Sequence, residues 1–342
     1  MDIRSQKEDE MIELALSMGE KAFRGRQLFQ WVHQKQAGSF DEMTNLSHQF
    51  REQLKSKFVL PAMTVFQKQI SRKKDTIKYL FLLPDGNVIE SVWMKYRYGN
   101  SVCVSSQVGC RMGCTFCAST LNGLTRNLTA GEMLSQVYEI QKDTGERVSH
   151  VIVMGMGEPL DNFASVVRFV RLLSDEKGIC ISQRNITVST CGLTEAIRDL
   201  MREHLQISLA ISLHAPNDEI RQKTMPVAKR YPIEEIFEVC REYVEQTGRR
   251  ITFEYSMIAG VNDRKEHAEE LSRRCKGLNC HVNLIPLNEV KERDCRRSGE
   301  AEIERFKSVL EKNHINVTVR REMGSDIDAA CGQLRKNYLE TS

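Results

Sequence analysis

The chain has 342 residues, a net charge of +3 and 41% hydrophobic residues, which is typical of a globular protein with one large and one small domain. It has no apolar run of the roughly 20 residues that a membrane span needs, and its start, "MDIRSQKEDEMIELAL", lacks the apolar core of a signal peptide. We therefore expect a cytoplasmic protein with no membrane partner, in which 11 cysteines argue for metal or redox chemistry rather than a disulfide framework.

The first 60 residues have the pattern of a helical module. In "EKAFRGRQLFQWVHQK" apolar side chains recur near helical spacing. The segment "SFDEMTNLSHQFREQLKSKF" follows, with Ser39 or Asp41 as a possible N-cap. We predict that residues 1–60 form an accessory domain.

Residues 61–98 alternate between apolar and polar side chains, as strands do. The runs are "TVFQKQI", "TIKYLFLL" and "NVIESVWM", and the turn sequence "PDGN" joins the last two. This pattern predicts a small antiparallel sheet that links the helical module to the rest of the chain.

Residues 99–342 alternate short apolar segments with helical ones. The apolar segments are "SVCVSS", "HVIVMG", "NITVST", "ISLAISLH", "ITFEYSMI" and "HVNLIPL", with "INVTVRR" as a candidate for one more strand. Helical patterns cover 129–143, 162–174, 232–247 and 263–275. The repetition predicts an α/β fold with a parallel sheet, closed into a barrel or a partial barrel.

Polar residues follow the predicted strands, at the point where each strand ends. They are Cys110 to Cys117, Gly155 to Glu158, Ser189, Ser212 with His214, and Asn288. In parallel α/β barrels the carboxyl ends of the strands form the active face. The pattern therefore predicts an enzyme site at that face.

The segment "CRMGCTFC" places Cys110, Cys114 and Cys117 at the spacing C-x3-C-x2-C. Thiolates this close bind zinc or an iron–sulfur cluster. A structural zinc site needs four ligands, but no Cys or His lies in the ten residues after Cys117, and Cys103 belongs to a predicted strand. The residues alone leave open a zinc loop or three buried thiols.

The cysteine spacing resembles the signature of the radical S-adenosylmethionine (SAM) superfamily. The resemblance implies that the three cysteines bind three irons of a [4Fe–4S] cluster. The fourth iron stays open for SAM, which one electron from the cluster cleaves to a 5′-deoxyadenosyl radical. The protein would position this chemistry and exclude water from it.

The segment "VIVMGMGEPLDN" resembles the superfamily's glycine–glutamate–proline motif. The resemblance implies that Gly157 and Glu158 contact the methionine amino group. It also implies that the cofactor is lined by Ser189, Ser212, Leu213, His214 and Asn288. On the residues alone, a tight strand-to-helix turn or a capped helix explains these positions equally well.

Motifs along nearly the whole chain resemble the RlmN family of RNA adenosine carbon-2 methyltransferases. They are "EKAFRGRQLFQW", "FDEMTNLS", "CVSSQVGCRMGCTFC", "RNLT", "MGMGEPL", "ISLHAPNDEIR", "FEYSMIAGVND" and "DIDAACGQL". The resemblance implies a six-stranded partial barrel with an accessory N-terminal domain. It implies two substrates, an adenosine of 23S rRNA in the peptidyl-transferase centre and an anticodon-loop adenosine of tRNA. We further expect a monomer and a reducing electron donor, with flavodoxin as the usual one for this superfamily.

The family also implies covalent catalysis through two further cysteines. Cys331 would take a methyl group from one SAM molecule, and the radical from a second would abstract hydrogen from that methyl. The resulting methylene radical would add to carbon 2 of adenine. The adduct would then lose an electron and its carbon-2 proton, which Glu90 would take, and Cys103 would attack the Cys331 sulfur to release the methylated base and leave a transient disulfide. Without the family, Glu90 reads as an exposed strand glutamate and Cys331 as a buried thiol.

The remaining cysteines, Cys180, Cys191, Cys240, Cys275, Cys280 and Cys295, are interpreted as incidental. Two rival functions stay open. The Cfr type, which methylates carbon 8 of the same adenosine and confers antibiotic resistance, shares the three-cysteine loop and both extra cysteines, although "SLHAPNDEIR" and "EMTNLS" look closer to the carbon-2 enzymes. The other rival is a non-enzymatic iron–sulfur or zinc module that binds RNA.

Overall fold

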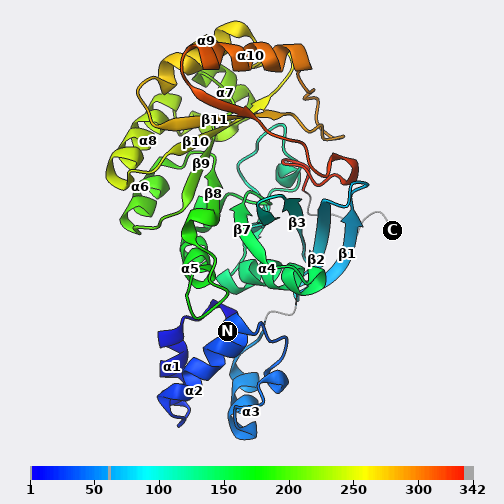
Figure 1. Cartoon of the computed structure of the whole chain (residues 1–342), viewed down its shortest axis with the longest axis vertical. Helices are drawn as coiled ribbons and strands as arrows, with labels where there is room; N and C mark the ends of the chain where they lie inside the picture. Colours follow the sequence, from blue (N-terminus) through cyan, green and yellow to red (C-terminus); the bar gives the residue numbers. More distant parts are fainter. Residues whose placement is uncertain (1, 61–62, 335–342) are drawn as a thin grey trace.

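The structure is a computed structural model that describes residues 2–60 and 63–334 (Figure 1). A helical module lies at one end of the molecule, drawn in blue. It contains an initial 3₁₀ turn, a second 3₁₀ turn before the last helix, and three α-helices, of which the second continues as a π-helical turn over Gln30–Gln34. Their bounds are Ile3–Ser5, α1 Glu8–Ser17, α2 Ala22–Phe29 and α3 His48–Lys57.

The predicted N-cap of the last helix is wrong. Ser47 caps α3, because its hydroxyl accepts a hydrogen bond from the Phe50 amide at 3.2 Å. Ser39 instead precedes a separate 3₁₀ turn over Phe40–Glu42, in which Asp41 lies. Both serines have the residue type of a cap, and only the turn between them decides which one starts the helix.

Ten strands form one continuous sheet. In spatial order they are β1 Thr64–Ile70, β2 Thr76–Leu82, β3 Val88–Tyr96, β4 Gly99–Cys103, β7 Val148–Val153, β8 Ile186–Thr190, β9 Ser208–Ser212, β10 Ile251–Met257, β11 Cys280–Pro286 and β12 Asn316–Val319. The pairs from β1 to β4 are antiparallel, and those from β4 to β12 are parallel. The predicted barrel strands and antiparallel extension are confirmed, and they share one sheet.

Helices of the α/β part connect successive parallel strands. They are α4 Ala130–Thr144, α5 Phe163–Leu173, α6 Thr194–Arg202, α7 Asp218–Thr224, α8 Ile233–Thr247, α9 Lys265–Cys275 and α10 Glu300–Lys312. Single 3₁₀ turns cover Ala118–Thr120, Pro159–Asn162, Gln183–Asn185, Pro226–Lys229 and Ser325–Ile327. The four helical patterns predicted in this region correspond to α4, α5, α8 and α9, and none of the helices in the described ranges is long and apolar enough to cross a membrane.

The helical module packs on α4 and α5 through buried polar groups. The Arg4 guanidinium donates to Ser135 Oγ at 2.7 Å and to the Ala37 carbonyl at 3.0 Å. His33 Nδ1 lies 2.9 Å from the Tyr138 hydroxyl, and burial lowers the pKa of His33 to about 3. The neutral imidazole and the buried arginine therefore fix the module against the barrel.

Candidate active site

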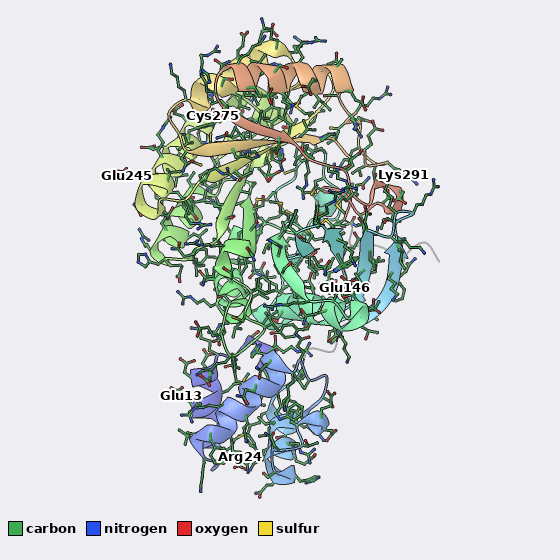
Figure 2. All side chains as sticks on the ribbon, in the orientation of Figure 1. Glu13, Arg24, Glu146, Glu245, Cys275 and Lys291 are labelled. Carbon is green, nitrogen blue, oxygen red and sulfur yellow. The ribbon has the colours of Figure 1, made fainter. Side chains whose placement is uncertain are left out.

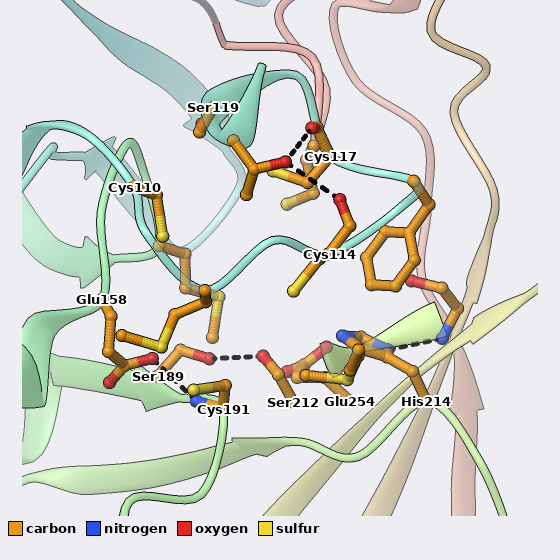
Figure 3. A pocket seen from close by; sticks show the side chains of 18 of the residues that line it. Cys110, Cys114, Cys117, Ser119, Glu158, Ser189, Cys191, Ser212, His214 and Glu254 are labelled. Atoms are coloured by element: carbon orange, nitrogen blue, oxygen red, sulfur yellow. Dashed lines mark hydrogen bonds between the residues drawn. The ribbon is translucent and has the colours of Figure 1, made fainter. Parts of the chain in front are cut away.

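A cavity of about 930 Å³, counted with the part that opens to solvent, lies at the carboxyl ends of the parallel strands (Figure 3). We call it the main cavity. Ten of the predicted site residues line it: Cys110, Cys114, Cys117, Gly157, Glu158, Ser189, Ser212, His214, Asn288 and Cys331. All of them except Cys331 follow a predicted strand, so the positions of the strand ends account for nine of the ten.

The three-cysteine loop is held by its own backbone and by α7. The Thr120 hydroxyl donates to the carbonyls of Cys114 and Cys117 at 3.0 and 2.9 Å. The Thr115 amide donates to the carbonyl of Thr224, at the end of α7, at 2.9 Å. A two-stranded sheet, β5 Gln107–Gly109 with β6 Leu124–Asn127, flanks the loop and was not predicted. These contacts aim the thiols into the cavity.

The donor set suits a group larger than one ion. In residues 2–60 and 63–334 no three Cys, His, Asp or Glu side chains are arranged to hold a single metal ion. The three thiols instead lie around one part of the main cavity (Figure 3), and the apolar side chains of Met112 and Met225 line the cavity as well. Burial raises the pKa of all three, that of Cys110 to about 12. Positively charged irons would stabilise the thiolates there, so the residues fit an iron–sulfur cluster.

Glu158 presents a buried carboxylate to the main cavity. Its Oε1 accepts from the Leu160 amide at 3.0 Å, and its Oε2 accepts from the Cys191 amide at 2.8 Å. Gly157 has φ +105°, and a Cβ there would lie 2.6 Å from Gln107 Cβ, so the turn requires glycine. Burial raises the pKa of Glu158. A ligand ammonium is the partner that this carboxylate lacks in the cavity wall.

Neutral polar side chains continue the cavity wall from Glu158 along the neighbouring strand ends (Figure 3). Ser189 Oγ and Ser212 Oγ lie 3.2 Å apart. His214 Nδ1 accepts from the Ser256 amide at 2.9 Å, and burial lowers the pKa of His214 to about 3, so the ring is neutral. Leu213 does not lie on the wall: its side chain is fully buried in the core. Of the predicted cofactor residues it is the one that the cavity does not include.

A second cavity, of about 560 Å³ including its open part, adjoins the main one. Cys103 lines it, and Cys331 lines both cavities. Both thiols are free. Burial and the neighbouring Cys331 raise the pKa of Cys103 to about 12, and the Arg320 guanidinium, which also lines both cavities, acts on both sulfurs. The two cysteines of the predicted covalent chemistry are therefore neighbours, 228 positions apart in the sequence.

The segment that carries Cys331 is held against the three-cysteine loop. The Ala118 amide donates to the Gly332 carbonyl at 2.7 Å, and the Ser119 hydroxyl donates to the Leu334 carbonyl at 3.0 Å. Asn288 Nδ2 donates to the Cys331 carbonyl at 3.2 Å. The predicted residue Asn288, which follows the end of β11, thus connects this strand to the segment that carries Cys331.

Glu90 lies beside the second cavity and does not line either cavity. It is fully buried on β3, so it is not an exposed strand residue. Its Oε1 lies 3.6 Å from Lys78 Nζ, and Lys78 donates to the Asp328 carbonyl at 3.2 Å. Val92 and Met94, at alternate positions further along the same strand, line the second cavity. Glu90 therefore shares the face of β3 that meets the Cys331 segment.

The sequence interpretation missed several wall residues. Cys191, taken as incidental, lines the main cavity and binds Glu158 through its amide. Glu254 also lines it, accepting from Asn283 Nδ2 at 2.9 Å. The signal for Glu254 was a charged residue inside the apolar run "ITFEYSMI". By contrast, Cys275 lies at the end of α9 (Figure 2), and Cys240 and Cys280 are buried with it in the core; Cys180 is exposed.

Comparisons with known proteins indicate the same class of enzyme as the site does. Residues 1–60 match the ribosomal RNA large subunit methyltransferase N-terminal domain, and residues 104–271 match the radical SAM superfamily. The chain is 58% identical over 339 residues to a protein of Lachnospira eligens named "Probable dual-specificity RNA methyltransferase RlmN", covering 99% of this chain and 97% of that one. A protein of the same name from Lachnoclostridium phytofermentans is 55% identical, with 99% and 96% covered.

A solved structure gives the same answer for the fold. The crystal structure of a radical SAM methyltransferase from Sphaerobacter thermophilus superposes with a TM-score of 0.94, at 45% identity, and the match covers 98% of this chain and 99% of that one. The radical SAM superfamily uses SAM and a [4Fe–4S] cluster, which the donor set of the main cavity fits. The carbon-8 alternative is not favoured, since the relatives carry the RlmN name. The chain belongs to the RlmN family of radical SAM dual-specificity RNA methyltransferases.

Proposed function

We propose that this enzyme methylates carbon 2 of one adenosine in the peptidyl-transferase centre of 23S rRNA and of one adenosine in the anticodon loop of tRNA. The observation that carries the proposal is the position of Cys331. Its side chain lies at the junction of a cavity that fits the cluster and SAM and a second cavity that holds Cys103. Cys331 could thus accept a methyl group from SAM bound in the main cavity and pass the methyl carbon to RNA bound at the second cavity.

Residues of the main cavity would bind the cofactors. Cys110, Cys114 and Cys117 would ligate three irons and leave the fourth open, and Glu158 with the turn at Gly157 would bind the SAM amino group. Ser189, Ser212, His214 and Asn288 would line the remainder, with Leu213 contributing from behind the wall. The bound cluster and two SAM molecules per turnover supply the methyl group and the radical.

Residues around the second cavity would carry out the steps on RNA. Cys331 Sγ accepts the methyl group and later links its carbon to the adenine. Once the methylene radical has added to carbon 2, the adduct would lose one electron, which the oxidised cluster could accept, and its carbon-2 proton. Glu90 would take that proton; its place on the face of β3 that lines this cavity supports that role. Cys103 Sγ would then attack Cys331 Sγ, which breaks the sulfur–carbon bond and leaves a disulfide, while the released carbon takes up a proton and becomes the methyl group of the base. An external reductant, of the flavodoxin class, must restore both thiols.

We also propose an arrangement of the whole chain. Residues 1–60 form the RNA-binding accessory domain, residues 61–98 the antiparallel extension and linker, and residues 99–342 the barrel with the catalytic-cysteine segment. The enzyme acts as a cytoplasmic monomer on RNA whose phosphates it binds through basic side chains, so affinity should fall steeply with salt.

Product analysis tests the proposal. The protein is reconstituted with iron and sulfide under anaerobic conditions and incubated with SAM, a reductant and 23S rRNA fragments or tRNA. Mass spectrometry against carbon-2 and carbon-8 standards should show 2-methyladenosine in both RNAs. A product with only carbon-8 methylation would contradict the proposed carbon-2 specificity. A colourless zinc protein that forms no 5′-deoxyadenosine would contradict the proposed radical SAM activity itself.

A further inference from the structure

Arg221, on α7, is one of the largest fully buried side chains of the protein. All three of its guanidinium nitrogens donate to backbone carbonyls. Nε donates to Leu213 at 3.3 Å, Nη1 to Tyr231 at 3.0 Å and Nη2 to Cys191 at 2.6 Å. The side chain therefore ties together the segments that follow β8 and β9, which carry much of the main cavity's wall.

No carboxylate in residues 2–60 or 63–334 lies within 4.0 Å of this guanidinium. Asp218 on the same helix acts on it only at longer range, and its carboxylate accepts from the Ile233 amide at 2.8 Å. The other fully buried arginine, Arg4, has Glu139 at 3.8 Å. Carbonyl dipoles satisfy the hydrogen bonds of Arg221, but a buried cation without a negative partner costs several kcal/mol.

The three-cysteine loop lies next to the element that carries Arg221. The loop amide of Thr115 donates to Thr224, the last residue of α7. A Cβ at Gly113 would touch Pro226, in the turn that follows α7, at 3.4 Å. Burial lowers the pKa of Arg221, and the thiols of Cys191 and Cys114 oppose that effect. A thiolate-ligated group in the main cavity would therefore place negative charge beside the element that carries Arg221.

We propose that Arg221 is the counter-cation of the iron–sulfur cluster, and that its fixed charge raises the cluster's reduction potential by stabilising the more negative reduced state. The inference rests on the proposed cluster site. Charge and hydrogen bonding near the ligands are among the means by which proteins tune such potentials. Arg221 is in this account a positioning residue that makes no contact with the reacting atoms.

The test is a redox titration of the reconstituted protein with dithionite, followed by the electron paramagnetic resonance signal of the reduced cluster. Arg221→Met removes the charge and keeps much of the volume, and Arg221→Lys keeps the charge. Arg4→Met is the control for loss of a buried arginine elsewhere. We expect Arg221→Met to disfavour reduction by about tenfold, which is about 59 mV for one electron. Arg221→Lys should stay within about threefold of the parent protein, and Arg4→Met should lower stability without changing the potential.

An unchanged potential in Arg221→Met, with cluster content intact, overturns the inference and leaves the proposed function standing. If Arg221→Met retains no cluster, Arg221→Gln, which can still donate to carbonyls, takes its place. Loss of the cluster in both neutral variants with retention in Arg221→Lys supports the charge. Loss in all three variants shows a purely structural anchor and contradicts it. A parent protein that binds no cluster refutes the proposed function itself, which is a separate outcome.

Discussion

The two cavities of this enzyme are built from different kinds of structure. The main cavity is surrounded by the ends of the parallel strands, and its polar groups are fixed by backbone amides, as at Glu158 and His214. The second cavity is closed by the segment that carries Cys331, held by contacts such as those of Ser119 and Asn288. The main cavity is thus formed mainly at the ends of the parallel strands, whereas the second cavity depends on a segment that packs over the sheet.

Cys114→Ala should have the largest effect, because it removes one of the three thiols that would bind the iron–sulfur cluster in the main cavity. We expect methylation to fall below detection and the brown colour of the reconstituted protein to be lost. The fold should persist, since the loop is also held by Thr115 and Thr120. Iron and sulfide analysis with a SAM cleavage assay checks this. Cys240→Ala, in the core away from both cavities, is the matched control and should keep its cluster; a brown, active Cys114→Ala would show that this thiol is not a ligand.

Glu90→Gln tests the second cavity. The substitution removes the carboxylate that neutralises Lys78 in a fully buried pair, so we expect the free energy of unfolding to drop by about 3 kcal/mol. Lys78→Met in the same chain should recover part of that loss. SAM cleavage, which belongs to the main cavity, should continue while release of methylated RNA stops. Urea unfolding and the two assays measure these effects, and equal loss of both activities would mean that the cavities are not separable.

Glu158→Gln tests whether the Glu158 carboxylate binds SAM in the main cavity. A carboxylate that binds an ammonium contributes about 2 kcal/mol, so SAM affinity should weaken about thirtyfold. Isothermal calorimetry on the reconstituted protein measures it, with Glu146→Gln as a control at a partly exposed glutamate that lines neither cavity. A SAM affinity within twofold of that of the parent protein would show that the Glu158 carboxylate does not bind SAM.

Substitution of His33 should have the smallest effect, because this residue lines neither cavity, and it serves as the control for the variants in both. Its pKa is about 3 in the folded protein and 6.5 ordinarily, so as pH falls below 6.5 the unfolded chain takes up a proton that the folded chain excludes. Stability therefore decreases between pH 6.5 and 3, by about 1 kcal/mol between pH 7 and 5.5. His33→Gln should flatten the slope by that amount and leave methylation at pH 7 unchanged. An unaltered slope would mean that the imidazole is protonated in the interface.

The main cavity was largely predictable from the sequence, because strand ends converge by the geometry of a parallel sheet. The positions of the predicted strands were enough to indicate that Cys110, Gly157 and Ser212 lie close together. The second cavity was not predictable in this way. Its thiols come from β4 and from a segment 228 positions later, and residue patterns do not report such distant contacts. The resemblance to a family, rather than spacing, paired Cys103 with Cys331.

The misses have local physical causes. Ser39 and Ser47 both suit an N-cap, and the choice depends on the intervening turn. The buried pairing of Glu90 with Lys78 follows from the register of β2 against β3, which alternation alone does not fix. Glu254 is a charged residue inside an apolar run, and Arg221 belongs to the charged segment "NDEIRQK"; only the fold shows that Glu254 lines the main cavity and that Arg221 is buried beside it.

Incubation of Cys103→Ala with SAM, reductant and tRNA is the most direct test of the claim that Cys331 joins the two cavities. The account predicts a covalent protein–RNA adduct that accumulates, survives denaturation and maps to Cys331 by peptide mass spectrometry. Cys331→Ala, and the double variant of both cysteines, should form none. Free methylated RNA without an adduct from Cys103→Ala, or an adduct mapped to any other residue, would contradict it.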